Sequence, residues 1–335
     1  METMNTTVSA LMQQGRGILA ADESNKTADK RFAAVGVAET EENRRRYREL
    51  LFTAPGVHRY LSGVILYDET IRQSTTDGTP FPQFLIAHDV HAGIKVDQGL
   101  EDMPGQPGAQ VTEGLDGLSE RLQEYKTLGA TFAKWRAVAH VGDGYADQAI
   151  KENAKRLAQY AVACHALDLV PMVEPEVLME GMHSAEDAEG TLIETLAIVA
   201  DALQQAGVSV PQVIFKTSMA VSGKEAPSRA APSEVAERTV RALKTALPET
   251  AGGVVFLSGG QTPQEATANF NAIARLEPHP WPITFSFSRA LQEPVLTLWA
   301  GNDAMREEAQ SEFLKRLTLN VAADAGGYSP GMESV

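Results

Sequence analysis

Short apolar or β-branched runs recur along the chain at intervals of roughly 30 to 45 residues, and this rhythm limits its possible folds more than any other feature. Between the runs the spacing is helical, as where Val235, Thr239, Leu243 and Leu247 place a stripe on one helix face. Strands that alternate with helices indicate a parallel sheet with crossover helices, and eight such units match the (β/α)8 TIM barrel. We therefore predict an α/β fold of this type, with an open doubly wound sheet as the alternative. The eight expected strands lie at 17–21, 62–68, 93–97, 132–138, 169–177, 213–219, 253–257 and 283–287.

The domain organisation follows from the same rhythm, which continues almost from end to end. No low-complexity block, long Gly/Ser linker or sequence repeat divides the chain, so we predict one domain over residues 1–335. We expect a frayed N-terminus over about residues 1–8 and a mobile tail over about residues 326–335. The Pro/Gly-rich segment 103–108 is typical of a surface loop.

The charge and cysteine content exclude several classes of partner and location. A formal net charge of -15 argues against nucleic acid and anionic membranes, whose phosphates require clustered Lys and Arg. Any anionic ligand must therefore meet a local basic pocket. The single cysteine, Cys164, excludes an intramolecular disulfide, and no apolar run approaches the length of a membrane span. With no basic, apolar leader at the N-terminus, a cytoplasmic location is expected.

Ionisable residues fall in or just after five of the expected strands, although buried parallel strands should be almost entirely apolar. Most of them lie toward the carboxyl half of their strand, which in a barrel is the end where active sites form. For any one of them, a structural salt bridge or a misplaced strand is the alternative explanation. Their agreement across five strands favours one shared pocket. The residues are Asp22, Lys95, Lys134, Arg136, Glu174, Glu176 and Lys216.

The geometry of a barrel interior suggests a nucleophile among these residues. Layers inside the barrel draw on alternate strands, so Lys134 and Lys216 are expected to be neighbours in one layer. Burial and a nearby like charge both lower a lysine's pKa, and a lysine must lose its proton before it attacks a carbonyl. Glu174 and Glu176 share a face and are expected to transfer protons, with ordinary strand-end carboxylates as the alternative.

A phosphate site is expected in the loops after the seventh and eighth strands, its usual place in a barrel. Ser258, Gly259 and Gly260 follow the seventh strand, and Ser288 and Arg289 follow the eighth. Glycine lets backbone amides approach phosphate oxygens, serine adds a hydroxyl, and arginine adds a charged fork. A tight turn that needs positive φ is the alternative explanation for the glycines.

Metal and cofactor chemistry is not indicated. The close pair His88 and His91 precedes the third strand, which places it at the bottom of a barrel, and Cys164 has only His165 beside it. No Gly-x-Gly-x-x-Gly or Walker-type loop follows a strand. We expect neither a metal nor an organic cofactor.

Segments spread over nearly the whole chain resemble the class I fructose-bisphosphate aldolases. That resemblance implies a metal-independent lyase that cleaves fructose 1,6-bisphosphate reversibly to dihydroxyacetone phosphate and glyceraldehyde 3-phosphate through a lysine Schiff base, in glycolysis or gluconeogenesis. The matching segments are GILAADES at 17–24, TEENR at 40–44, GIKVD at 93–97, GLDGLSER at 114–121, FAKWR at 132–136, VEPE at 173–176, FLSGGQ at 256–261 and RALQ at 289–292.

The resemblance also implies a role for each matching residue. Lys216 would be the Schiff-base lysine, Glu174 the principal proton-transfer residue and Glu176 its helper, while Lys134 and Asp22 would position and polarise the substrate. The remaining matches concern the phosphates and the subunit interface. Ser258, Gly259 and Arg289 match the site of the phosphate nearest the ketone, Lys95, Arg31 and Arg136 match basic positions toward the distal phosphate, Ser24 lies in a matching segment, and Asp116 matches an interface position of homotetramers.

Several positions depart from the family pattern. The family's chain ends in a tyrosine that exchanges a proton with the enamine, whereas here the last tyrosine is Tyr328. Ser288 stands where the family has glycine, Thr27 stands where a phosphate-contacting serine is usual, and Thr217-Ser218 follows Lys216 in place of Pro-Asn. These departures leave open a preference for sedoheptulose 1,7-bisphosphate or fructose 1-phosphate. A non-catalytic scaffold barrel is the alternative from another class.

Overall fold

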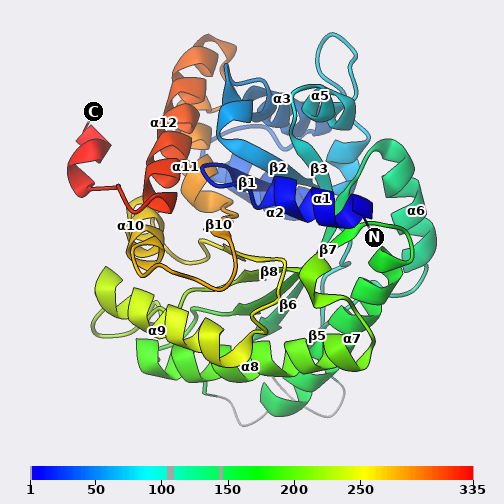
Figure 1. The fold of residues 1–335 in the computed structure, drawn as a ribbon. Helices are drawn as coiled ribbons and strands as arrows, with labels where there is room; N and C mark the ends of the chain where they lie inside the picture. Colours follow the sequence, from blue (N-terminus) through cyan, green and yellow to red (C-terminus); the bar gives the residue numbers. More distant parts are fainter. Residues whose placement is uncertain (1, 104–108, 143–145, 335) are drawn as a thin grey trace.

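The computed structural model describes residues 2–103, 109–142 and 146–334, and it shows eight parallel strands in a nearly closed barrel surrounded by helices (Figure 1). The predicted TIM barrel is confirmed, and the open doubly wound sheet is excluded. The strands run in the order β1-β2-β3-β6-β7-β8-β9-β10. Their bounds are β1 Gly17–Ala21, β2 Leu61–Leu66, β3 His91–Lys95, β6 Phe132–Ala139, β7 Val170–Val177, β8 Ile214–Thr217, β9 Gly253–Phe256 and β10 Ile283–Phe285.

The barrel closes where the first strand meets the last. The backbone N–H of Ala20 donates to the carbonyl of Phe287 at 3.0 Å, and Thr284 Oγ1 donates to the carbonyl of Arg16 at 3.0 Å. Gly17 allows this approach, because a Cβ there would lie 2.2 Å from the Phe285 ring. We call this junction of β1 and β10 the seam.

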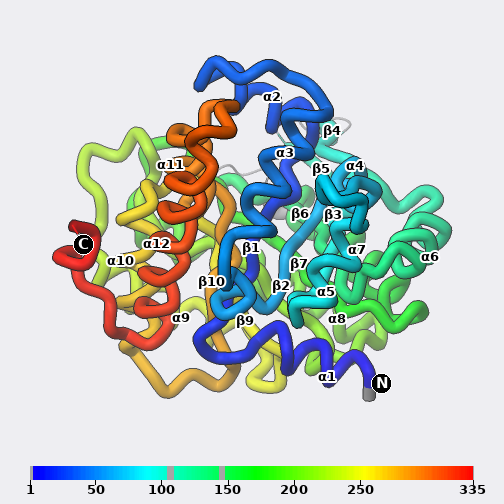
Figure 2. The backbone as a smooth tube through the Cα atoms, turned by 90° about the horizontal axis from the view of Figure 1, so that it is seen from above, coloured from blue at the N-terminus to red at the C-terminus, as the bar shows by residue number. Residues whose placement is uncertain are grey.

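Twelve α-helices in the described part of the chain surround the strands, as the view from above shows (Figure 2). Local sequence fixes several of their starts: Ser184 and Asp187 form a capping box at α8, and Thr262 and Glu265 form one at α10. The helices are α1 Glu2–Leu11, α2 Asn25–Ala34, α3 Glu41–Phe52, α4 Asp68–Ile71, α5 Phe81–Ala87, α6 Leu118–Leu128, α7 Ala146–His165, α8 Ala185–Gln205, α9 Pro232–Ala246, α10 Pro263–Ala274, α11 Arg289–Trp299 and α12 Arg306–Asp324. Short 3₁₀ helices lie at Val57–Arg59, Val210–Gln212, Asp303–Met305 and Pro330–Ser334.

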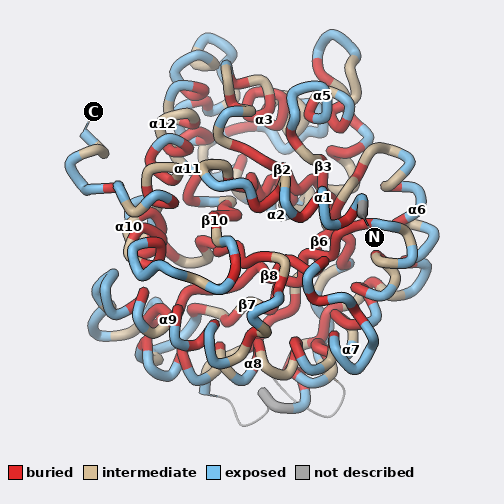
Figure 3. The backbone as a smooth tube through the Cα atoms, in the orientation of Figure 1, coloured by how far each residue is buried: buried red, intermediate tan, exposed pale blue. Residues whose placement is uncertain are grey.

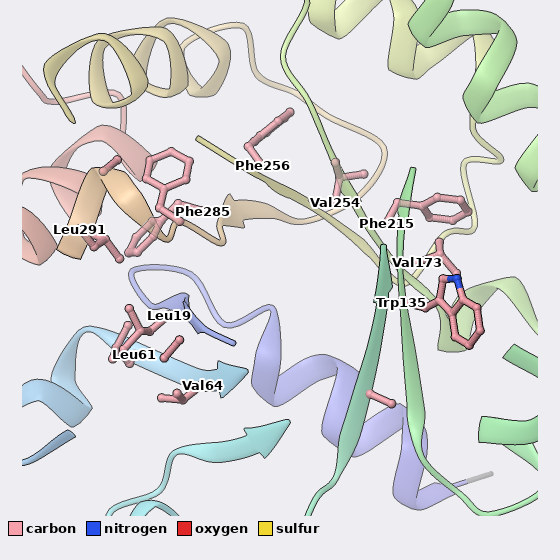
Figure 4. Packing of buried hydrophobic residues seen from close by; sticks show 14 of the residues in the cluster. Leu19, Leu61, Val64, Trp135, Val173, Phe215, Val254, Phe256, Phe285 and Leu291 are labelled. Carbon is pink, nitrogen blue, oxygen red and sulfur yellow. The ribbon is translucent and has the colours of Figure 1, made fainter. Parts of the chain in front are cut away.

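The core has two parts, and the buried backbone follows the strands (Figure 3). The larger part lies between the strands and the helices, where Trp135, Val173, Phe215 and Phe256 point outward from neighbouring strands (Figure 4). Alternate side chains of the same strands point into the barrel, as the period of a strand requires. The fold thus leaves the inward positions near the carboxyl ends free for polar groups.

The smaller part of the core fills the lower barrel and is closed by the N-terminal helix. Met4 and Val8 of α1 are buried together with Ile18, Phe132 and inward-facing residues of other strands. The N-terminus was expected to be frayed, but from residue 2 onward it forms α1, because its apolar face covers the open end of the barrel.

The C-terminal segment 326–334 is held against the outer helices α10 and α12, whereas the sequence pattern indicated a mobile tail. Tyr328 is buried and donates through its hydroxyl to Glu333 Oε1 at 3.0 Å. The other carboxylate oxygen of Glu333 lies 2.6 Å from the guanidinium of Arg316, which is itself buried. This ion pair connects the segment to α12.

One element of the fold has no counterpart among the expected strands. Strands β4, Leu100–Asp102, and β5, Gln110–Thr112, form an antiparallel hairpin outside the barrel. They flank the segment 103–108 that the sequence predicted as a loop, of which residues 104–108 lie outside the described residues. No helix in the described part of the chain is long and apolar enough to cross a membrane.

Candidate active site

A cavity of about 910 Å³ lies at the carboxyl ends of the barrel strands. It meets the expectation that the ionisable residues of different strands converge, because all the predicted site residues except Gly260 and Arg31 contribute to its wall. Those residues are Asp22, Ser24, Thr27, Lys95, Lys134, Arg136, Glu174, Glu176, Lys216, Ser258, Gly259, Ser288 and Arg289.

Four charged side chains form a continuous buried row in this cavity. Glu174 lies between the two lysines, with Oε1 at 2.9 Å from Lys216 Nζ and Oε2 at 2.8 Å from Lys134 Nζ. On its other side, Lys134 Nζ lies 2.7 Å from Asp22 Oδ2. The exposed fraction of the Lys134 side chain is 3%, and that of the Glu174 side chain is 5%. Two lysines and two carboxylates are thus held together out of water.

Strand pairing explains this row. β6 and β7 pair in parallel with Lys134 opposite Met172 and Arg136 opposite Glu174. The two basic residues of β6 and the two acidic residues of β7 all face the cavity, as their spacing of two predicts. Each basic side chain of β6 pairs with the acidic side chain two positions beyond its register partner on β7, Lys134 with Glu174 and Arg136 with Glu176.

The electrostatics of the row fix the charged state of three of its members. Burial raises the pKa of Asp22, but the charges of Lys134 and Lys216 outweigh burial and hold this pKa at about 2. Burial alone would likewise raise the pKa of Glu174, and the same two lysines lower it below its ordinary value. Burial opposes the charge of Lys134, yet Asp22 and Glu174 raise its pKa above its ordinary value. Both carboxylates are therefore ionised and Lys134 is a cation at neutral pH.

The expected contact between two lysines needs a correction. Lys134 and Lys216 do share one region of the barrel, but Glu174 bridges them and Asp22 balances the charge of Lys134. Lys134 and Lys216 are therefore separated by a carboxylate and do not meet as two unscreened like charges. Proton exchange through the shared carboxylate replaces charge repulsion as the reason to regard Lys216 as a nucleophile.

A second layer of ion pairs lies toward the rim. Arg136 pairs with Glu176, and Lys95 Nζ lies 2.6 Å from Asp97 Oδ1. Burial opposes the charge of Arg136, and Glu176 outweighs burial to raise its pKa. Gly259 leaves room for this carboxylate, since a Cβ at this position would lie 2.9 Å from Glu176 Oε1 and would displace it.

The opposite side of the cavity has the features of an anion site. Ser258 and Gly259 follow β9, and Arg289 is the first residue of α11. The first amides of a helix lack intrahelical acceptors and attract anions. Arg289 is exposed and forms no hydrogen bond or ion pair with the described residues, so its guanidinium is available to a ligand.

Two predicted residues lie outside the cavity wall. Gly260 has a φ of +71°, and a Cβ there would lie 2.5 Å from Met179 Sδ, so a turn and close packing account for this glycine. Arg31 on α2 pairs with Glu23 and lines a separate small crevice beside the cavity. The structure thus separates Arg31 from Lys95 and Arg136, with which the sequence grouped it.

Three further residues of the cavity were not singled out from the sequence. Glu23 and Asp97 both follow apolar strands, so the signal that identified Asp22 was present for them as well. Ser286 is buried, and its Oγ has no hydrogen-bond partner in the described structure. As an uncharged residue, Ser286 gave no comparable signal.

The residues considered for a metal and for final proton transfer lie elsewhere. His91 Nδ1 lies 3.0 Å from Thr131 Oγ1, and His88 Nδ1 lies 2.8 Å from the carbonyl of Phe84, so each histidine has its own local partner. Within the described ranges, no group of three or more His, Cys, Asp or Glu residues could hold a metal ion. Tyr328 lines a different hollow, between α9 and α10.

Comparison with known proteins gives a consistent result over the whole chain. A family model described as "Fructose-bisphosphate aldolase class-I" matches residues 3–335. A "Probable fructose-bisphosphate aldolase class 1" of Xanthomonas axonopodis pv. citri is 48% identical over 332 residues, 98% of each chain. "Fructose-bisphosphate aldolase 5, cytosolic" of Arabidopsis thaliana is 47% identical over 319 residues, 95% of this chain and 89% of the relative.

Among solved structures, the chain is similar to the fructose-bisphosphate aldolase of Plasmodium falciparum, crystallised in complex with TRAP and a small molecule inhibitor. The two share 42% sequence identity and superpose with a TM-score of 0.96, covering 98% of this chain and 96% of the other. The likeness therefore extends over the barrel strands and the helices around them.

Proposed function

The chain belongs to the class I fructose-bisphosphate aldolase family, and on that premise we propose that the cavity at the barrel mouth is its active site, with Lys216 as the imine-forming lysine. The activity is the reversible, metal-independent cleavage of fructose 1,6-bisphosphate to dihydroxyacetone phosphate and glyceraldehyde 3-phosphate. The observation that supports the residue assignment is the contact of Glu174 with both buried lysines.

In the first stage, Lys216 Nζ passes its proton to Glu174 and attacks the ketone carbon of the substrate. Glu174 lies 2.9 Å away and returns the proton to the oxygen of the carbinolamine. It then takes a second proton from the nitrogen and delivers it to the same oxygen, which leaves as water as the nitrogen lone pair forms the C=N bond. Lys134 stays a cation beside that oxygen, because Asp22 and Glu174 hold its proton. Its charge polarises the carbonyl, and the product of this stage is an iminium on Lys216.

In the second stage, the iminium accepts the electron pair of the breaking C3–C4 bond. A carboxylate must take the proton of the C4 hydroxyl, and we assign this step to Glu174, with Glu176 assisting proton transfer around the imine. Asp22 pairs with Lys134, whereas Glu174 also contacts Lys216, so we assign Asp22 to the orientation of Lys134 and the substrate hydroxyls. Glyceraldehyde 3-phosphate leaves, and the proton that Glu174 took passes to C3 of the enamine. Water then hydrolyses the resulting imine by the reverse of the first stage, which releases dihydroxyacetone phosphate and free Lys216.

The two phosphates occupy opposite sides of the cavity. Arg289, the amides at the start of α11, and the Ser258-Gly259 turn hold the phosphate nearest the ketone. Lys95 and Arg136 hold the distal phosphate at the rim, with the hydroxyls of Ser24 and Thr27 at the start of α2. The substrate is thereby fixed across Lys216.

Borohydride trapping tests the assignment of the nucleophile. The enzyme is incubated with dihydroxyacetone phosphate and borohydride, with and without EDTA, and the modified peptide is identified by mass spectrometry. We expect the adduct on Lys216 in both samples. An unmodified Lys216 would overturn the assignment, and loss of the adduct with EDTA would contradict metal independence.

The preference among ketose phosphates is a separate measurement. We propose fructose 1,6-bisphosphate as the main substrate, because both a proximal and a distal basic group face the cavity. Specificity constants for this sugar, sedoheptulose 1,7-bisphosphate and fructose 1-phosphate would establish the order. A higher value for either of the other two would overturn the preference.

Assembly and location complete the proposal. We propose a homotetramer, supported by the family match and by the exposure of Asp116 ahead of α6. Light scattering on the purified protein and on Asp116→Ala would measure the assembly, and a monomer for both would contradict it. A cytoplasmic location is supported by the relative named cytosolic and would be checked by cell fractionation.

A further inference from the structure

Glu23, a largely buried carboxylate in the cavity wall, is held by four side chains, two from α2 and α3 and two from the start of α11 and the residue before it. Its Oε1 accepts hydrogen bonds from Ser288 Oγ at 2.9 Å and from Gln292 Nε2 at 3.1 Å, and it also pairs with Arg31. Its Oε2 lies 2.6 Å from Arg48. One oxygen therefore receives three donors, which is crowded for a single carboxylate oxygen with two lone pairs.

Arg31 is the partner that is least well satisfied in this arrangement. It pairs with Glu23 through Nη1, but its Nη2 is buried and has no hydrogen-bond partner in the described structure. A buried donor without an acceptor carries a desolvation cost. Thr27, four positions earlier on α2, lines the cavity. Arg31 itself lines the small crevice beside the cavity, and Glu23 belongs to the walls of both, so this one carboxylate separates Arg31 from the cavity.

Arg31 can leave Glu23 only if the other hydrogen-bond donors still satisfy this carboxylate. Gln292 Nε2 also donates to the carbonyl of Ala20 at 2.7 Å and to Ser288 Oγ at 3.2 Å, so its amide is shared among three acceptors. The Ser288 hydroxyl has a single proton, and it is directed at Glu23. Ser288 therefore still donates its hydroxyl proton to Glu23 Oε1 when Arg31 moves away.

We propose that Ser288 is a positioning residue that satisfies Glu23 while Arg31 turns from it to a substrate phosphate in the cavity. With serine present, Glu23 keeps Arg48, Gln292 and Ser288 after the exchange, and no buried charge is left uncompensated. The family pattern has glycine at this position, which supplies no donor. The proposal rests on the proposed function of the cavity, and it assigns this chain a way to recruit Arg31 that the glycine does not provide.

A double-mutant cycle on KM for fructose 1,6-bisphosphate tests the proposal. We expect Ser288→Ala to raise KM by at least roughly tenfold, as for loss of one hydrogen bond to a charged group, with kcat within twofold. Ser288→Thr should keep the wild-type KM, because it keeps the hydroxyl. In an Arg31→Ala background, Ser288→Ala should change KM no further. Independent, multiplicative effects of the two changes, or an unchanged KM in Ser288→Ala, would overturn the role of Ser288.

Two controls distinguish an effect of Ser288 from a general loosening of the structure and from a wrong assignment of the active site. Ser62 also has a buried hydroxyl, which donates to the carbonyl of Leu11 at 2.7 Å at the bottom of the barrel, so Ser62→Ala should leave KM unchanged. A rise of KM in that variant equal to that in Ser288→Ala would assign the effect to general loosening and overturn the proposal. Borohydride trapping on the unaltered enzyme tests the premise: no adduct on Lys216 overturns the proposed function, whereas an adduct with independent KM effects overturns only the role of Ser288.

Discussion

Glu174 contacts two lysines with its two carboxylate oxygens, Lys216 at 2.9 Å and Lys134 at 2.8 Å. One oxygen faces the proposed nucleophile, and the other faces a lysine whose proton is held by Asp22 as well. A proton released by Lys216 therefore reaches a base within one hydrogen-bond distance, while Lys134 keeps the region positively charged. This one carboxylate therefore allows Lys216 to lose its proton while Lys134 keeps its own.

Glu174→Gln keeps the shape of the side chain and removes its basicity. We expect kcat to fall by roughly 10²- to 10⁴-fold, the usual contribution of a positioned acid or base, with a much smaller change in KM. Stopped-flow kinetics and the rate of borohydride inactivation in the presence of dihydroxyacetone phosphate would measure the loss. A variant with more than a third of the wild-type kcat would contradict the assigned role.

Lys134→Met leaves Asp22 and Glu174 buried with their shared cation gone. We expect the free energy of unfolding to fall by roughly 3 to 5 kcal/mol, because uncompensated buried charges are strongly destabilising. Urea denaturation would measure it. The matched control is Lys155→Met, which removes an exposed lysine 3.8 Å from Glu152 and should change stability by less than about 0.5 kcal/mol. Equal effects in the two variants would contradict the structural role of the row.

Asp324 on α12 gives a pH dependence of stability outside the active site. Its Oδ2 accepts from the backbone N–H of Gly15 at 2.9 Å, while Oδ1 is buried without a partner in the described structure. Burial outweighs the bond from Gly15 and raises the pKa of Asp324 from 3.8 to about 6. This raised pKa corresponds to roughly 2 to 3 kcal/mol in favour of the neutral carboxyl.

The sign follows from proton linkage. The folded protein binds this proton more tightly than the unfolded chain does, so the stabilisation is complete below pH 3.8 and is lost as the pH rises to about 6 and just above. Asp324→Asn should therefore raise Tm at pH 7.5 and leave it nearly unchanged at pH 4. Calorimetry across this range, with the exposed Asp201→Asn as control, would measure the difference. A lower Tm for Asp324→Asn at pH 7.5 would contradict the assignment.

Tyr328→Phe tests whether the last tyrosine of the chain takes part in the final protonation. Its hydroxyl donates to Glu333, and the residue lines the hollow between α9 and α10 and not the active-site cavity. We expect kcat and the exchange of the C3 proton of dihydroxyacetone phosphate to stay within twofold, with a stability loss of about 1 kcal/mol. Exchange measured by NMR in D₂O is the direct readout. A tenfold slower exchange would show that Tyr328 reaches the enamine.

Much of the fold could be predicted because the apolar runs, the helical spacing between them and the positions of the ionisable residues all indicated a barrel. The strands are short apolar runs, and most of their ionisable residues lie toward the carboxyl end, where the active site of a barrel forms. The alternation that put Lys134 with Arg136, and Glu174 with Glu176, depends only on the period of a strand. These inferences needed no knowledge of which strand lies beside which.

The pairing of the charged groups could not be predicted, because it depends on tertiary contacts. The place of Glu174 between the two lysines requires the register of β6 against β7 and the distance to β8. The direction of Arg31 depends on Glu23, Arg48 and Ser288, which come from three separate parts of the chain. The covering of the barrel bottom by α1 likewise follows from packing, since a short polar-looking N-terminus carries only a weak apolar stripe.

The seam between β1 and β10 brings together residues from the two ends of the chain that the active site requires. Thr284 and Arg16, which form one of its hydrogen bonds, are 268 positions apart, and Asp22 meets Ser286 and Arg289 only across this junction. Contacts so distant in sequence form late, and domains emerge from the ribosome N-terminus first. A chain that ends before β10 lacks Ser288 and Arg289 of the cavity wall. The complete cavity therefore requires every strand of the barrel, from β1 to the residues that follow β10.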